Sequence, residues 1–160
     1  MKLHHYTTPA GFDAITERGL EPQSTYPGRT DPVTYAFLTE ATMWPRGVPI
    51  DDIWSMNVLK GIIWSIGRGE REGPEGLVHL TFEAPDNTIV HDRAQIQTSD
   101  EAYQASGVAL ENRAWERYER PEAVIRTATP RDKITVIETL NRDEVRALFR
   151  EYSQDIPTTF

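Results

Sequence analysis

The chain contains no cysteine. This absence excludes disulfide bonds, iron–sulfur clusters, cysteine-ligated zinc and a thiol nucleophile. It fits a reducing compartment, and we therefore expect a cytoplasmic protein. The sequence also lacks an apolar stretch of about 18 residues, which a membrane-spanning helix needs, and its first residues lack the apolar core of a signal peptide. We accordingly expect no membrane partner.

Basic residues are scarce relative to acidic ones. Of the 160 residues, 17 are Lys or Arg and 25 are Asp or Glu, which gives a net charge of −8. Because phosphate contacts dominate the affinity of proteins for nucleic acid, this charge argues against a broad basic binding face. A local pocket that binds one nucleotide or base remains compatible with it. The length predicts a single domain over residues 1–153, followed by a loose tail over 154–160.

Several motifs that carry chemistry are missing. The four histidines occur without a second ligand at metal-binding spacing, so we expect no metal site. No glycine-rich sequence has the spacing of a phosphate loop or of a dinucleotide-binding turn, and no serine stands in a nucleophile elbow. Kinase, Rossmann-type and serine-hydrolase chemistry therefore have no support.

What is present is a mixture of short strands and a few helices. Runs rich in β-branched and aromatic residues predict strands at 3–7, 33–39, 77–84, 88–91, 124–128 and 134–139. Capping residues and apolar spacing predict helices between Thr8 and Gly19, over 51–66 and over 141–152. The second half of 51–66 also fits a strand. Segment 98–118 fits a helix that starts after Ser99 or, over 114–118, a strand. The pattern favours an α+β fold.

The first predicted strand holds the most unusual group of side chains, His4, His5, Tyr6 and Thr7. Successive side chains of a strand point to opposite faces, so His4 and Tyr6 share one face and His5 and Thr7 share the other. A buried imidazole needs a hydrogen-bond partner. One of the two pairs therefore faces the core or a cleft, where it is either structural or functional.

Residues 3–20, LHHYTTPAGFDAITERGL, resemble the opening of ADP-ribosyltransferase-like proteins of the His-Tyr-Glu branch, such as the DNA-targeting toxins of the DarT type. Those families start with a strand that carries a histidine, followed by a short helix and a Gly-Leu turn. Residues 35–40, YAFLTE, are similar to the next strand of the family. Residues 115–125, WERYERPEAVI, are similar to a late strand that usually bears or follows the catalytic glutamate.

The resemblance implies two small, mostly antiparallel sheets around an NAD cleft with flanking helices. It implies a transfer of ADP-ribose from NAD to an acceptor, which is a protein side chain, a nucleic-acid base or a small molecule, with release of nicotinamide. NAD is then a substrate, and no metal is needed. The candidate catalytic residues are Glu111 and Glu116. The candidate NAD-binding residues are His5, Tyr6, Thr7, Arg29, Tyr35, Phe37 and Arg46.

The residue types suit this chemistry. Cleavage of the glycosidic bond of NAD develops an oxocarbenium ion, which a nearby carboxylate stabilises. A histidine in the first strand binds ribose hydroxyls or the diphosphate, and Tyr35 or Phe37 stacks on nicotinamide. Arg29 or Arg46 pairs with the diphosphate. In the structural alternative, the two aromatic residues belong to the core and the two arginines are solvated loop charges.

Two other functions stay open on the sequence. One is a catalytically inactive nucleotide- or partner-binding module on the same fold, which acts as an inhibitor, an immunity factor or a regulatory protein. The other is an interaction protein that uses the tryptophan-containing loop between Thr39 and Ile53. Binding of NAD without cleavage selects the first, and a stable complex that survives mutation of His5 selects the second.

Overall fold

The computed structural model describes residues 1–26, 28–38 and 75–153. The strands are β1 (Lys2–Thr7), β2 (Thr34–Ala36), β3 (Gly76–Glu83), β4 (Ile89–Asp92), β5 (Val108–Ala109), β6 (Pro121–Ile125) and β7 (Thr135–Asn141). The α-helices are α1 (Pro9–Arg18), α3 (Asp100–Ala105) and α4 (Arg142–Ser153). The described residues also form the short 3-10 helices η2 (Arg93–Gln97), η3 (Arg113–Arg117) and η4 (Arg131–Lys133).

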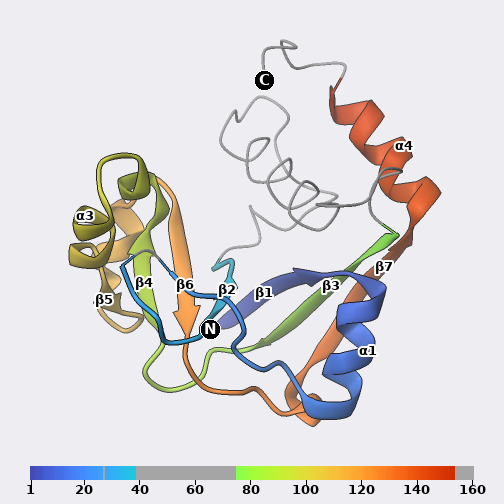
Figure 1. Ribbon diagram of the computed structural model, residues 1–160, viewed down its shortest axis with the longest axis horizontal. Helices are drawn as coiled ribbons and strands as arrows, with labels where there is room; N and C mark the ends of the chain where they lie inside the picture. The colour runs from blue at the N-terminus through green and yellow to red at the C-terminus, as the bar shows by residue number, and fades with distance from the viewer. Residues whose placement is uncertain (27, 39–74, 154–160) are drawn as a thin grey trace.

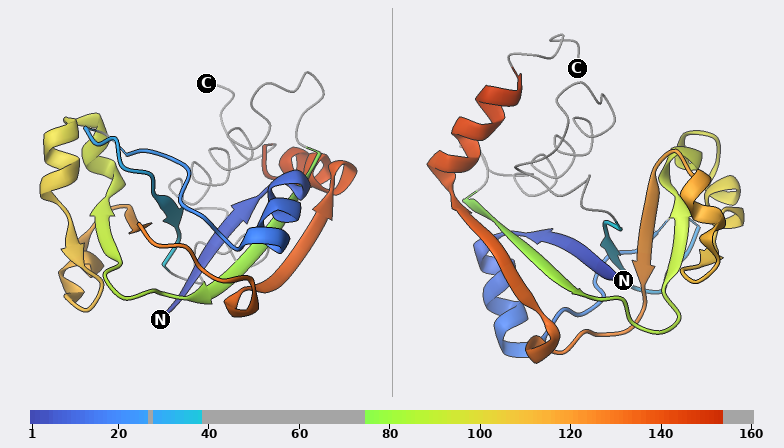
Figure 2. Two further views of the ribbon diagram at one scale, coloured as in Figure 1. Left: turned by 60° about the horizontal axis from the view of Figure 1, so that its bottom comes forward. Right: turned by 180° about the vertical axis from the view of Figure 1, so that it is seen from behind.

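The strands form two antiparallel sheets, which lie side by side in Figure 1. The three-stranded sheet has the order β1-β3-β7, and the four-stranded sheet has the order β2-β6-β4-β5. Helices α1 and α4 lie beside the three-stranded sheet, whereas α3 lies at the far side of the four-stranded sheet (Figures 1 and 2). The expectation of an α+β fold with two small antiparallel sheets is confirmed.

The opening strand and helix form as the sequence predicts. The Thr8 hydroxyl accepts a hydrogen bond from the Gly11 amide and so caps α1, and Pro9 stands in the first turn, where its missing amide hydrogen costs nothing. Gly19 ends the helix with φ +79°, and a Cβ there would approach the Thr129 carbonyl oxygen to 2.5 Å. Leu20 then pairs with Thr129, which ties the end of α1 to the segment before β7.

The main core lies between the two sheets. Leu3, Leu80 and Phe82 of the three-stranded sheet join Val90 and Ile125 of the four-stranded sheet in one buried cluster. A second, smaller cluster covers the other face of the four-stranded sheet. It consists of Tyr26, Val33, Tyr103 and Val124, with Tyr35 and Ile96 packed against it. The four-stranded sheet is therefore covered on both faces.

Several elements of the structure differ in extent from those that the sequence predicts. Residues 114–118 lie almost entirely in η3 and form no strand, because the Asn112 side chain caps a helical turn at Ala114. The strand predicted over 124–128 runs instead from Pro121 to Ile125. The strand predicted over 33–39 is regular only at Thr34–Ala36, after which Phe37 makes an isolated bridge to His4.

The helix predicted after Ser99 is confirmed as α3, which ends before Gly107. The closing helix is also confirmed. The Asn141 side chain accepts a hydrogen bond from the Glu144 amide, and the Glu144 carboxylate accepts one from the Asn141 amide, which is a capping box. The predicted element over 51–66, the tryptophan-containing loop and the predicted tail over 154–160 lie outside the described residues. No helix in the described part of the chain is long and apolar enough to cross a membrane.

Candidate functional site

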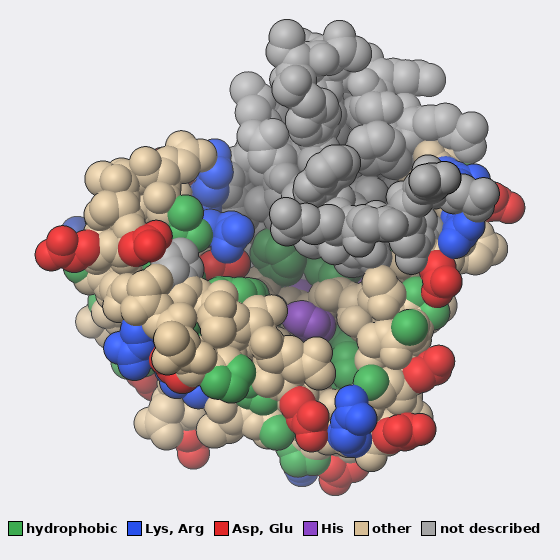
Figure 3. Space-filling model, viewed as in Figure 1, with side chains coloured by type: hydrophobic (Ala, Val, Ile, Leu, Met, Phe, Trp, Pro, Cys, Tyr) green, Lys and Arg blue, Asp and Glu red, His purple; other side chains and the backbone are tan. Residues whose placement is uncertain are grey.

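A cavity of about 180 Å³ opens where β1 and β2 meet the end of α1. Its walls come from β1 at His5 and Thr7, from β2 at Tyr35, and from the turn after α1 at Gln23 and Ser24. The face drawn in Figure 3 is hollowed between the two halves of the described structure, with histidine and hydrophobic side chains inside the hollow. The volume is below the range of about 300–1,000 Å³ that is typical of pockets for drug-sized ligands. The described cavity is therefore smaller than a typical pocket for a whole drug-sized ligand.

His5 links the two sheets at this cavity. Its Nδ1 lies 2.8 Å from the Tyr35 carbonyl oxygen. A carbonyl oxygen only accepts, so Nδ1 carries the hydrogen and donates it. Burial lowers the pKa of His5, against the smaller opposite effect of that hydrogen bond. The ring is therefore neutral near pH 7, and Nε2 has a lone pair that suits a hydroxyl donor such as a ribose hydroxyl.

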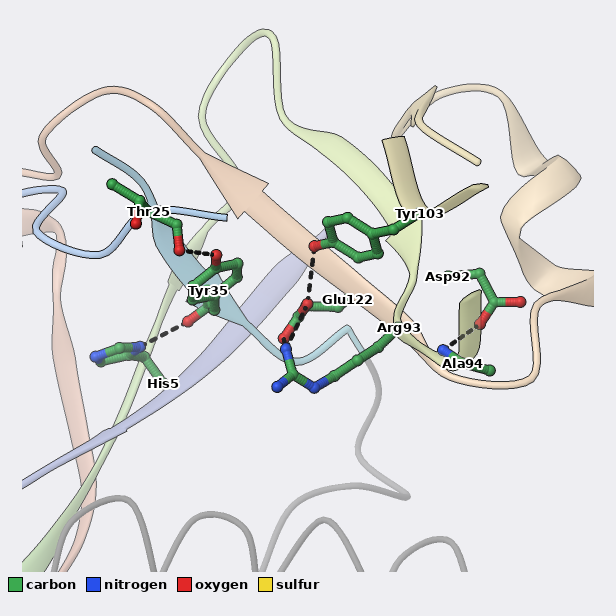
Figure 4. Close-up of polar contacts among 8 residues, drawn as sticks. All are labelled: His5, Thr25, Tyr35, Asp92, Arg93, Ala94, Tyr103 and Glu122. Carbon is green, nitrogen blue, oxygen red and sulfur yellow. Dashed lines mark hydrogen bonds and ion pairs between the residues drawn. The ribbon is translucent and has the colours of Figure 1, made fainter. Parts of the chain in front are cut away.

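A second polar group, the carboxylate of Glu122, lies on the opposite side of Tyr35 from His5 (Figure 4). It stands at the start of β6, with a side chain that is 14 % exposed. The Tyr103 hydroxyl donates to Glu122 Oε2 over 3.0 Å, and Nη1 of Arg93 lies 3.2 Å from Oε1 and 3.3 Å from Oε2. The carboxylate is thus held by donors from α3 and η2.

The electrostatics of Glu122 combine two opposing effects. Burial raises its pKa, while Arg93 and the hydrogen bond from Tyr103 act in the opposite direction. The Glu122 charge also reaches Tyr35, whose pKa is raised by burial first and by Glu122 second. The Tyr35 hydroxyl donates to the Thr25 carbonyl oxygen over 2.6 Å, so the ring is fixed at both ends. Tyr35 therefore lies between the cavity, which it lines, and Glu122, which is not among the lining residues.

Asp92 positions the turn that carries Arg93. Its Oδ1 accepts hydrogen bonds from the amides of Ala94 and Arg120, and it is 6 % exposed. The Arg93 amide donates to the Arg120 carbonyl oxygen over 2.9 Å. These bonds join the end of β4 to the segment just before β6. Arg93 and Glu122 are therefore brought together by backbone connections as well as by their own charges.

The predicted NAD-binding residues fall into separate places. His5, Thr7 and Tyr35 line the cavity together. Tyr6 lies on the opposite face of β1, where it stacks on His79 with ring centroids 4.4 Å apart, and Phe37 contacts Tyr6 edge-on at 5.8 Å.

The predicted arginines and glutamates lie elsewhere. Arg29 pairs with Asp31 at 3.1 Å, away from the cavity lining, and Arg46 lies outside the described residues. Glu111 is exposed in the turn before η3, and Glu116 is exposed on η3, where it forms an ion pair with Arg113.

The sequence interpretation missed Glu122, Arg93 and Tyr103. Glu122 had one available signal, since it directly precedes the apolar run Ala123–Ile125 and so stands at the edge of a buried strand. Arg93 and Tyr103 had no comparable signal, because they are distant from Glu122 in sequence and meet it only through the fold. Among the residues that the structure describes, no group of three or more His, Asp or Glu is arranged to hold a metal ion.

Comparison with protein-family models, with curated proteins and with solved structures finds no match to this chain.

Proposed function

We propose that this chain is an NAD-dependent ADP-ribosyltransferase that uses Glu122, rather than Glu111 or Glu116, as the carboxylate at the reacting ribose. The observation that carries the proposal is the pair of groups on either side of Tyr35. His5, a neutral imidazole, lines the cavity of about 180 Å³, and Glu122 is a largely buried carboxylate on the far side of the same tyrosine, outside the cavity lining. The opening motif LHHYTT and the two antiparallel sheets agree with this proposal.

The chemistry requires one bond to break and one to form. The bond between the nicotinamide nitrogen and C1′ of its ribose breaks, and nicotinamide leaves with the electron pair, which neutralises its pyridinium charge. Positive charge develops on the ribose, and a carboxylate in a desolvated position stabilises that charge. The acceptor nucleophile then bonds to C1′, and its proton passes to solvent water. Glu122 suits the carboxylate role because it is 14 % exposed and held by two donors.

His5 suits the binding role. Its Nδ1 hydrogen is used by the Tyr35 carbonyl, so Nε2 is an acceptor of fixed direction. Thr7 lines the same cavity. An imidazole acceptor and a threonine on one face of a strand offer polar groups for the hydroxyls of a ribose.

The test is nicotinamide release from NAD in the presence of protein, RNA and single-stranded DNA as acceptor pools. We expect Glu122→Gln to lower turnover by about 10²–10³-fold, by analogy with the loss of other charge-stabilising groups. Glu116→Gln is the matched control and should stay within about twofold, because its carboxylate is exposed and paired with Arg113. His5→Ala should weaken NAD binding. Equal effects of the two glutamate variants would remove Glu122 from this role.

A second candidate is a nucleotide-binding module on the same fold that does not turn over. The observation that favours it is Arg93, whose guanidinium lies on both carboxylate oxygens of Glu122. A cation in that position opposes the development of a second positive charge nearby. Calorimetric binding of NAD by the wild-type chain, with no nicotinamide released under any acceptor, would select this candidate.

A further inference from the structure

Tyr103 lies beneath Glu122 and has no exposed surface. Its hydroxyl donates to Glu122 Oε2 over 3.0 Å. Because the ring is fully buried, it does not reach a molecule bound in the cavity. Any effect of Tyr103 on a reaction must therefore pass through Glu122.

Tyr103 is itself held from its other side. Its carbonyl oxygen accepts hydrogen bonds from Nδ1 of His91, at 2.9 Å, and from the Ser106 hydroxyl. The His91 ring stacks on the Tyr103 ring with centroids 4.7 Å apart and planes 22° apart, and Tyr26 contacts Tyr103 edge-on at 6.1 Å. The phenol therefore has one direction in which to present its hydroxyl.

We propose that Tyr103 is a positioning residue that fixes the Glu122 carboxylate in one orientation and keeps it ionised for the reaction. This inference rests on the proposed function. The Tyr103 hydroxyl and Nη1 of Arg93 both donate to Oε2, and Nη1 of Arg93 also lies 3.2 Å from Oε1, so the Tyr103 hydrogen bond holds one of the two oxygens against the buried side of the protein. The hydrogen bond is made to the charged form, so it favours ionisation against the effect of burial.

The other groups that face Glu122 come from three elements. Arg93 of η2 donates to both carboxylate oxygens, and Tyr35 of β2 is close enough for its pKa to respond to the Glu122 charge. His91 of β4 is the register partner of Glu122, and its Nδ1 hydrogen is used by the Tyr103 carbonyl. Arg93 is 54 % exposed, so its charge is screened by water and salt. Tyr103 is the donor that solvent does not reach.

The test compares Tyr103→Phe with Tyr26→Phe, which removes a hydroxyl from the same aromatic cluster without touching Glu122. The pKa of Glu122 is measured in the full chain by carbon NMR of the side-chain carboxyls, with the resonance assigned through Glu122→Gln. We expect Tyr103→Phe to raise that pKa, which weakens the acid about threefold to tenfold. The acid limb of the pH profile of nicotinamide release should move to higher pH by the same amount. Tyr26→Phe should change neither.

The kinetic constants separate positioning from binding. In Tyr103→Phe we expect kcat to fall about tenfold at pH values below the shifted limb, while KM for NAD stays within about twofold. His91→Phe is a second variant that keeps the stacked ring and removes the donor to the Tyr103 carbonyl. It should be tolerated, because the buried Nε2 of His91 has no hydrogen-bond partner in the described part of the chain. It should shift the Glu122 titration in the same direction by a smaller amount.

Failure of the proposed function and failure of the role of Tyr103 give different experimental results. Wild-type protein that releases no nicotinamide from NAD would overturn the proposed function. An unchanged titration of Glu122 in folded Tyr103→Phe, or a rise in KM with an unchanged kcat, would overturn the role of Tyr103 alone.

Discussion

His79 in the three-stranded sheet and Glu122 in the four-stranded sheet are largely buried titratable groups of opposite kind. In the three-stranded sheet, His79 is 2 % exposed, and its Nε2 lies 3.2 Å from Nδ1 of His4. In the four-stranded sheet, Glu122 is 14 % exposed and receives donors from Arg93 and Tyr103. Burial opposes the charged form in both places. The imidazole responds by staying neutral, whereas the carboxylate is supplied with partners for its charge. The first arrangement is structural, and the second is suited to chemistry.

The two groups also give stability opposite dependences on pH. Burial, aided by His4, lowers the pKa of His79 from 6.5 to about 4, so the unfolded chain binds more protons between those values and stability falls as pH falls through them. Burial raises the pKa of Glu122 above 4.5, so the folded chain binds more protons just above that value and stability falls as pH rises there. The following predictions test this contrast, from the largest expected effect to the smallest.

The largest expected change in the free energy of unfolding comes from a substitution in the core that both sheets share. Leu80 has no exposed surface and packs in the main cluster, so Leu80→Ala should lower the free energy of unfolding by about 2–5 kcal/mol. Its register partner on β7, Val136, is 36 % exposed and provides the control. Val136→Ala should cost less than about 1 kcal/mol. Urea unfolding at pH 7 measures both, and equal losses would show that the cluster is not the shared core.

The next largest expected change is the pH dependence of the free energy of unfolding that His79 of the three-stranded sheet causes. Between pH 6.5 and pH 4, His79 should remove up to about 3 kcal/mol from the free energy of unfolding, because its neutral form is the one that the fold accepts. His79→Gln should remove most of this slope, which urea unfolding at a series of pH values measures. A variant with the same slope as the wild-type chain would assign the acid sensitivity to another group.

The smallest expected change is the pH dependence of the free energy of unfolding that Glu122 of the four-stranded sheet causes. Glu122→Gln should remove the loss of stability that the wild-type chain suffers as pH rises above 4.5, since an amide carries no charge to desolvate. Glu116→Gln should change the free energy of unfolding by less than about 0.5 kcal/mol at every pH, because its pair with Arg113 is exposed. The same unfolding series measures both variants. The contrast between the sheets would fail if Glu122→Gln and Glu116→Gln behaved alike.

Local signals predicted the elements that depend on neighbouring residues. The sequence predicts the helix between Thr8 and Gly19 and the closing helix from residue 141, and the caps that form them lie within a few residues of each helix end. Residues 114–118 were ambiguous for the same reason. The Asn112 cap competes there with strand-forming side chains, and the cap prevails.

In the candidate site, too, local pattern predicts some of the residues and not others. His5 and Thr7 were placed on one face by strand alternation, and the structure puts both in the cavity lining. Glu122 was passed over in favour of Glu111 and Glu116, because the boundary of the late strand was unknown. A shift of that strand to Pro121–Ile125 places Glu122 within it and leaves Glu111 and Glu116 on the exposed surface.

The sequence by itself determined the α+β class, the absence of thiol chemistry and the division of β1 into a His4–Tyr6 face and a His5–Thr7 face. These follow from composition and from the two-residue period of a strand. Only the tertiary structure decided which acidic residues are desolvated. Among the described residues, Asp92 is 6 % exposed and is held by backbone amides, whereas Glu122 is 14 % exposed and is held by the side chains of Arg93, 29 positions away, and Tyr103, 19 positions away. Burial of a charge is a property of packing between distant segments, and no local pattern encodes it.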